Sequence, residues 1–170
     1  MIKLTKYQVV LTVLFVIIYT ATIQISAKSI LENKVEHMPI DIHINSALAL
    51  FWLNILTVLC ALILIIFQSL IYKIIVGVLG TKQKFSIGLN VFLFITSILP
   101  GAVITAVLTL LNNGVSVSQN FLIIIFTILL SAGLYSVILW CFSIIDKSKI
   151  KLVFLIITIL NALVSLFKLL

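Results

Sequence analysis

The side chains that could act together in catalysis or metal binding are concentrated in one short polar stretch between two long apolar ones. This stretch contains two histidines and three carboxylates: Glu32, Glu36, His37, Asp41 and His43. Imidazole and carboxylate groups are ligands for zinc and other divalent cations. Their spacing here matches no closed metal site, and a short loop outside a membrane has to be polar in any case. We therefore expect a solvated loop and no metal centre, with metal binding by His37 and His43 left open.

No other residues form a recognisable catalytic arrangement. Ser116 and Ser118 lack the G-x-S-x-G context of a hydrolase nucleophile, and the histidines belong to a different loop. Cys60 and Cys141 fall inside separate apolar stretches, outside any C-x-x-C pair, and are expected to be free, buried thiols. A glycine-rich phosphate loop is also missing. The sequence therefore predicts a protein that is not an enzyme and that uses no cofactor.

The apolar stretches themselves indicate the fold class. The chain of 170 residues is 64% hydrophobic and 9% charged, with a mean hydropathy of +1.42. Because this leaves too little polar surface to cover a soluble globule, lipid has to solvate the chain. We expect an all-α, polytopic membrane protein with one domain over residues 1–170, a bundle of five transmembrane helices. The expected spans are residues 7–27, 46–72, 87–111, 121–145 and 152–167, with an outer loop at 28–45.

The lysines predict how the helices are oriented. All eleven basic residues are lysine and the formal net charge is +7, but they occupy short segments at helix ends, which favours anionic head groups over nucleic acid as partners. Eight fall on one side of the predicted membrane and three on the other: Lys3, Lys6, Lys73, Lys82, Lys84, Lys147, Lys149 and Lys151 against Lys28, Lys34 and Lys168. The positive-inside rule then predicts a cytoplasmic N-terminus and an extracytoplasmic C-terminus. The lysine-rich and isoleucine-rich composition indicates an AT-rich genome, and hence the plasma membrane of a bacterium.

The first apolar stretch also resembles a secretory signal. Lys3 and Lys6 precede it, and Ile25-Ser26-Ala27 could form a cleavage site. A bulky isoleucine at the third position before the cut is unfavourable, so we expect a span that is not cleaved.

Small and polar residues recur at helical spacing in every predicted span. The set comprises Thr12, Thr20, Gln24, Asn54, Thr57, Ala61, Gln68, Asn90, Ser97, Gly101, Thr105, Thr127, Ser131, Tyr135, Thr158, Asn161 and Ser165. Residues three, four or seven apart share a helix face, so these stripes can turn inward and hold a bundle together by interhelical hydrogen bonds. The alternative is a polar path for a solute. No charged residue or histidine lies within a predicted span, which argues against ion-coupled or proton-coupled transport.

Pro100 and Gly101 predict a kink in the third span, because proline removes a backbone donor and glycine loosens the next residue. Such kinks usually shape helix packing in membranes. A hinge or gate at the same position is the sharper alternative.

Three short motifs follow one another between Leu48 and Gly101. They are IYKIIVGVLG at residues 71–80, TKQKFS at 81–86 and SILP at 97–100. This stretch resembles the bacterial branch of the Yip1 family, in which a long second helix is followed by an interfacial segment, a glycine, a basic turn with a phenylalanine, and a third helix ending near a proline. The second glycine of that pattern is replaced by Thr81, and only six residues precede the first span, so the small-GTPase partners of eukaryotic members are not carried over. The resemblance implies five spans and a non-enzymatic protein that organises or binds membrane proteins or lipids.

The basic segment inside this resemblance is the predicted contact surface. Lys73, Lys82, Lys84 and Phe85 flank the apolar residues 74–79, and we expect them to bind anionic head groups or a membrane partner, including a second copy of the chain. The plainer interpretation is an ordinary positively charged loop. Two other functions stay open: a small-solute pathway or transporter accessory subunit, and a bacteriocin-type immunity protein.

Overall fold

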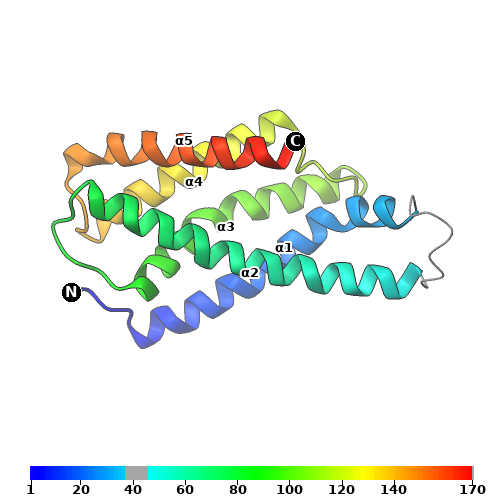
Figure 1. The fold of residues 1–170 in the computed structure, drawn as a ribbon, viewed down its shortest axis with the longest axis horizontal. Coiled ribbons are helices and arrows are strands. Elements are labelled where there is room, and N and C mark those ends of the chain that lie inside the picture. The colour runs from blue at the N-terminus through cyan, green and yellow to red at the C-terminus, as the bar shows by residue number, and fades with distance from the viewer. Residues whose placement is uncertain (37–45, 170) are drawn as a thin grey trace.

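Five long helices make up most of the structure, a computed structural model that describes residues 1–36 and 46–169 (Figure 1). They are α1 (Lys6–Glu36), α2 (Ser46–Val78), α3 (Ile87–Leu111), α4 (Phe121–Cys141) and α5 (Ile150–Leu169), with a short 3-10 turn, η1 (Lys147–Lys149), before α5. All five are long and apolar enough to cross a membrane. The predicted all-α bundle of five helices is confirmed.

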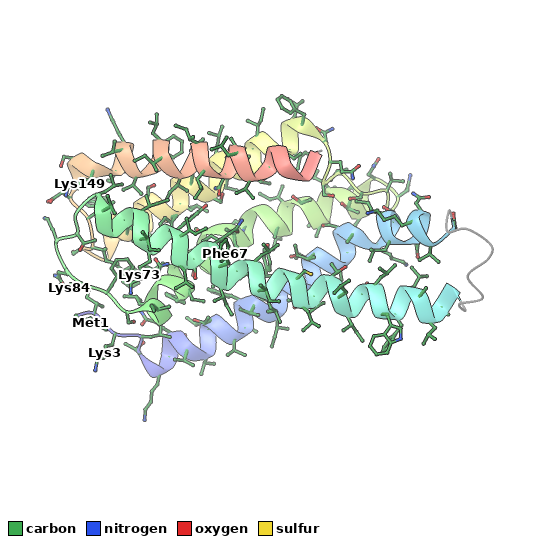
Figure 2. The ribbon with its side chains drawn as sticks, viewed as in Figure 1. Met1, Lys3, Phe67, Lys73, Lys84 and Lys149 are labelled. Atoms are coloured by element: carbon green, nitrogen blue, oxygen red, sulfur yellow. The ribbon has the colours of Figure 1, made fainter. Side chains whose placement is uncertain are left out.

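Successive helices run in opposite directions, so the chain alternates between the two ends of an elongated bundle (Figure 1). One end gathers the N-terminus, the α2–α3 connection and the α4–α5 connection. The opposite end holds the α3–α4 connection and the end of α5. The alternation therefore brings together at the first end the eight lysines that the sequence assigns to one side, four of which are labelled in Figure 2.

Two helices extend well beyond their predicted spans, and α5 extends by two residues at each end. No proline or glycine interrupts residues 6–36, and α1 continues through Lys28, whose ammonium group lies 3.9 Å from the Glu32 carboxylate. The second, α2, continues past Lys73 to Val78 and ends before Gly80, whose φ of +85° suits a glycine after a helix. At about 1.5 Å per residue it is roughly 50 Å long, against roughly 30 Å for a hydrocarbon core. Hydropathy marks the apolar part of each helix, whereas the helix itself continues into polar surroundings.

The fourth helix is shorter than predicted and ends at Cys141 rather than at residue 145. Ser143 has a φ of +54°, and the Ile144 N–H donates to the Leu139 carbonyl at 2.9 Å, a bond that closes a helix end. Ile144 and Ile145 then turn back into the core, where they are 0% and 1% exposed. The apolar sequence continues beyond the end of the helix because these two side chains are buried by tertiary packing.

The third helix is the centre of the bundle. It packs against α1, α2 and α4, and α4 packs in turn against α5. Phe15 of α1 stacks on Phe92 of α3 with ring centroids 6.3 Å apart, and Leu93 and Phe94 are fully buried. Over the described residues, α2 and α5 are not closely packed against each other. The arrangement is therefore an arc of helices around α3, with its open side between α2 and α5.

Candidate functional site

Three chain segments at the N-terminal end of the bundle join into one structure. We call it the cap, and it comprises residues 1–5, 79–86 and 142–149. Ile2 and Phe85 form a parallel bridge. The Ile2 N–H donates to the Lys84 carbonyl at 2.8 Å, and the Ser86 N–H donates to the Ile2 carbonyl at 2.9 Å. The first two segments thus satisfy each other's backbone groups although they are far apart in the sequence.

The third segment is attached to the second through Lys149 and Lys82. The Lys149 ammonium group donates to the carbonyls of Leu79 and Gly80, each at 2.8 Å. A positive charge at this position also complements the partial negative charge at the C-terminal end of α2. The Lys82 N–H donates to the Ile144 carbonyl at 2.8 Å. Hydrogen bonds between loops, as well as apolar packing, therefore hold the cap together.

The four residues predicted to contact lipid or a partner all lie in or beside the cap, but in different settings; Lys73 and Lys84 are labelled in Figure 2. Phe85 is 5% exposed, so its ring does not face outward as predicted; the N-terminal segment pairs across it and it packs in the core. The Lys73 ammonium group lies 5.8 Å from the centre of that ring. The Lys82 ammonium group is 2.7 Å from the Asp146 carboxylate. Lys84 is exposed.

The outer surface of the cap and the adjoining helix ends is basic. Exposed lysines there are Lys3, Lys6, Lys82, Lys84, Lys147 and Lys151. Asp146 is the one acidic residue in the three cap segments, and it is paired with Lys82. The surface therefore carries a positive charge that no neighbouring carboxylate of the cap cancels.

Deeper in the bundle, a buried polar network joins four helices. The Tyr135 hydroxyl of α4 donates to Asn90 Oδ1 of α3 at 2.5 Å, and Asn90 Nδ2 donates to the Ser69 carbonyl of α2. The Tyr72 hydroxyl of α2 donates to Asn161 Oδ1 of α5, and the Tyr72 and Tyr135 rings meet edge to face with centroids 5.0 Å apart. Such bonds replace the water that is lacking inside a bilayer. The predicted inward stripes therefore do hold helices together at this level.

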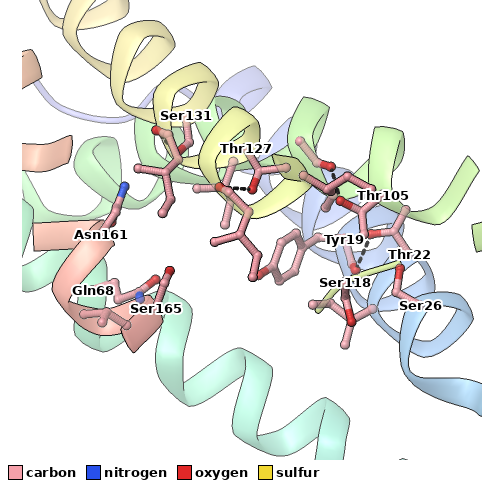
Figure 3. A pocket seen from close by; sticks show the side chains of 18 of the residues that line it. Tyr19, Thr22, Ser26, Gln68, Thr105, Ser118, Thr127, Ser131, Asn161 and Ser165 are labelled. Carbon is pink, nitrogen blue, oxygen red and sulfur yellow. Dashed lines mark hydrogen bonds between the residues drawn. The ribbon is translucent and has the colours of Figure 1, made fainter. Parts of the chain in front are cut away.

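On the side of the network away from the cap lies a cavity of about 290 Å³, lined by residues from all five helices (Figure 3). Its polar lining consists of Tyr19, Thr22, Ser26, Gln68, Tyr72, Thr105, Ser118, Gln119, Thr127, Ser131, Asn161 and Ser165. In Figure 3 the α1 residues face those of α2 and α5 across the space. The described residues that line the cavity include no charged side chain.

The predicted stripes account for part of this lining. Those that line the cavity are Gln68, Gly101, Thr105, Thr127, Ser131, Asn161 and Ser165. On α1 the lining residues are Thr22 and Ser26 instead of the predicted Thr12, Thr20 and Gln24, since polar residues occur around the whole of α1 and only packing selects a face. Tyr19, Tyr72 and residues 118–119 carried no sequence pattern that assigned them to the cavity.

At the predicted kink, Pro100 and Gly101, the structure shows a close contact between helices. The third helix is continuous through Pro100, and Gly101 is buried against α4. A Cβ at Gly101 would lie 3.4 Å from side-chain atoms of Thr127. The glycine therefore allows close approach of two helices beside the cavity. A kink or gate at Pro100 stays a prediction.

The two cysteines are free, as predicted, but both are exposed on the bundle surface and not buried. A lipid-facing position accepts a small apolar thiol as readily as a core position does, so hydropathy cannot distinguish the two.

The remaining chemical candidates form no catalytic or metal site among the described residues. His37, Asp41 and His43 lie outside the described residues, and among those that are described no cluster of metal-ligating side chains occurs. The Ser116 and Ser118 hydroxyls are 2.8 Å apart, and the Ser116 N–H donates to Ser29 Oγ of α1 at 2.9 Å. This serine pair anchors the α3–α4 connection to α1.

Comparison with family models, with curated proteins and with solved structures finds no match to this chain. The two candidate regions therefore have to be interpreted from their own geometry.

Proposed function

We propose that the protein is a non-enzymatic, multi-pass membrane protein whose cap binds anionic lipid head groups and so organises the surrounding bilayer. The observation that carries this proposal is the exposed lysine surface of the cap, whose single carboxylate is already paired with Lys82. Each lysine near an anionic membrane surface contributes about 1 kcal/mol. Several of them on a structured surface add up to a substantial preference for anionic lipid.

Apolar side chains beside the lysines support the same function. Ile74 and Val78, on the last turns of α2, are 66% and 83% exposed. They can lie at the acyl boundary while Lys73 and Lys84 lie at the level of the head groups. The cap and the end of α2 thus combine exposed apolar side chains with exposed lysines, the two kinds of surface that binding at a membrane interface requires.

The orientation and the resemblance to the Yip1 family belong to the same proposal. With the N-terminus in the cytoplasm of a bacterium and the C-terminus outside it, the cap faces the leaflet surface that the positive-inside rule associates with lysine. The motifs at residues 71–86 that carry the resemblance lie in and beside the cap. A family of non-enzymatic membrane organisers fits a protein whose exposed charge is concentrated there.

Native mass spectrometry of the purified full-length chain tests the proposal by counting bound phosphatidylglycerol against phosphatidylcholine. The double variant Lys3→Gln/Lys84→Gln removes two exposed lysines of the cap. At about 1 kcal/mol each, their loss should reduce the preference for phosphatidylglycerol roughly thirtyfold at low salt. The difference should shrink as ionic strength rises.

The matched control is Lys28→Gln/Lys34→Gln, which makes the same charge change at the opposite end of the bundle. It should leave most of the preference intact. An equal loss in both double variants, or a native chain with no preference for phosphatidylglycerol, would rule out a lipid-binding role for the cap. Lipid-independent capture of a membrane protein through the cap would favour the partner-binding version of the hypothesis instead.

The small-solute pathway is a second candidate because one observation favours it, the polar cavity among the five helices. A pathway needs continuous polar lining from one end of the bundle to the other. The cavity is lined from the network to the α3–α4 connection, whereas the core between the network and the cap is packed with Val76, Leu139 and Val153, all 0% exposed. This packing favours a binding site over a channel.

A further inference from the structure

Five polar side chains of the cavity have no hydrogen-bond partner among the described residues: Tyr19, Ser26, Gln68, Gln119 and Ser165. Other hydroxyls of the lining are satisfied within their own helices: Thr22, Thr105 and Thr127 donate to carbonyls three or four residues earlier. Ser26 is 9% exposed and lines the cavity, yet its hydroxyl has no hydrogen-bond partner among the described residues. The Gln68 amide, which also lines the cavity, is likewise without one. A polar group left unpaired in such surroundings is costly, so both are set to bond a ligand or water.

The lining also restricts the charge of what can bind. The described lining residues carry hydroxyl and amide groups and no charged side chain. Moving an ion into such a site costs several kcal/mol without a countercharge. Hydroxyls and amides both donate and accept hydrogen bonds, which suits a ligand whose own groups are hydroxyls.

The size of the cavity fits a small ligand. Its volume of about 290 Å³ is at the lower end of the roughly 300–1,000 Å³ typical of ligand pockets. One sugar ring or a glycerol unit is of a suitable size, whereas a drug-sized molecule is not.

The position of the cavity favours entry from the membrane. Gln68 of α2 and Ser165 of α5 border it beside the Tyr72–Asn161 hydrogen bond, and elsewhere along the described chain the backbones of these two helices are not closely packed. A head group could therefore enter between α2 and α5 while its acyl chains remain in lipid.

We propose that this cavity binds an uncharged, polyhydroxylated group, carried as the head group of a neutral lipid or as a free polyol. The Gln68 amide and the Ser26 hydroxyl bond it from opposite sides of the space. This site is separate from the cap, so the inference does not rest on the lipid-binding function proposed for the cap.

The test uses the full-length chain in phosphatidylcholine nanodiscs and follows its thermal unfolding midpoint as a probe is titrated. A ligand that binds only the folded state raises this midpoint with concentration. Two uncharged probes distinguish the sources: monoglucosyl diacylglycerol as the lipid and methyl glucoside as the free polyol. Methyl glucuronide serves as the charged analogue. We expect one or both uncharged probes to raise the midpoint and the glucuronide to leave it unchanged.

Variants connect the response to the cavity. Gln68→Leu and the milder Ser26→Ala should each require about three to ten times more probe for the same response, the loss expected for one neutral hydrogen bond. Gln24→Leu makes the same change as Gln68→Leu at an exposed position outside the cavity, and should titrate like the native chain. A shift with the glucolipid alone identifies a lipid site, and a shift with methyl glucoside a site for free polyols. The proposal is overturned if neither uncharged probe acts, if the glucuronide acts equally, or if both cavity variants titrate like the native chain.

Discussion

The cap and the cavity treat polar groups in opposite ways. In the cap, backbone groups are paired between loops and most charged side chains point outward, as the Ile2–Phe85 bridge and exposed Lys84 illustrate. In the cavity, the polar side chains are neutral and point inward, and Ser26 and Gln68 have no hydrogen-bond partner in the part of the chain that the structure describes. The difference follows from the solvent. Charge is stable only where water or head groups reach it, whereas a neutral hydroxyl or amide can be kept within the bundle at modest cost.

The largest effect is expected in thiol labelling, which tests whether the cap and the α3–α4 connection beside the cavity face opposite sides of the membrane. In a chain lacking Cys60 and Cys141, we expect an impermeant thiol reagent to label Gln119→Cys on intact cells. Ser148→Cys, in the cap, should be labelled only after the membrane is opened. Both positions are exposed, so accessibility within the protein does not limit either reaction. The reverse labelling pattern would invert the proposed orientation.

The network between the two regions should give the next largest effect. Asn90→Leu removes the acceptor of the Tyr135 hydroxyl, leaving that buried group unpaired, and also removes the bond from the Asn90 amide to the Ser69 carbonyl of α2. The expected loss of unfolding free energy is about 1–3 kcal/mol, measured by unfolding in detergent.

Asn54→Leu is the control for that substitution. Among the described residues its amide donates only to the Leu50 carbonyl of its own helix, at 2.9 Å, so the loss should stay under about 1 kcal/mol. Equal losses at the two asparagines would show that the network adds nothing to what a single helix provides.

The smallest effect is expected at the surface of the cap. The Lys82–Asp146 pair is short, at 2.7 Å, but the side chains are 54% and 43% exposed. Asp146→Asn should therefore cost about 0.2–1 kcal/mol at low salt, and the difference from the native chain should disappear at high salt. A larger loss that persists in salt would mean that this pair is a structural element of the cap.

Local patterns were sufficient to predict the helices and the grouping of the lysines. Apolar length and loop charge act within a few residues, so five spans and two unequal ends could be derived without tertiary information. The end of α4 could not, because Ile144 and Ile145 are apolar in order to fill the core and not to continue a helix.

The site could be predicted only in part, for a related reason. Gln68, Asn161 and Ser165 share helix faces, and their inward direction follows from spacing. Ser26 was missed because α1 has polar residues on several faces. The burial of Phe85 was missed because the residue that pairs with it, Ile2, comes from a distant part of the chain. Both outcomes depend on packing between segments that are remote in sequence.

The bridge between residues 2 and 85 also bears on how the protein is assembled during synthesis. Ile2 leaves the ribosome long before residues 84–86, its backbone partners. At roughly 5–20 residues per second, the interval is about 4–17 s, in which α1 and α2 enter the membrane first. Ile144, which accepts from Lys82, follows only after α3 and α4. The cap therefore cannot be complete before Ile144 has been synthesised, although the pairing of Ile2 with residues 84–86 requires only the first two helices and the connection after them.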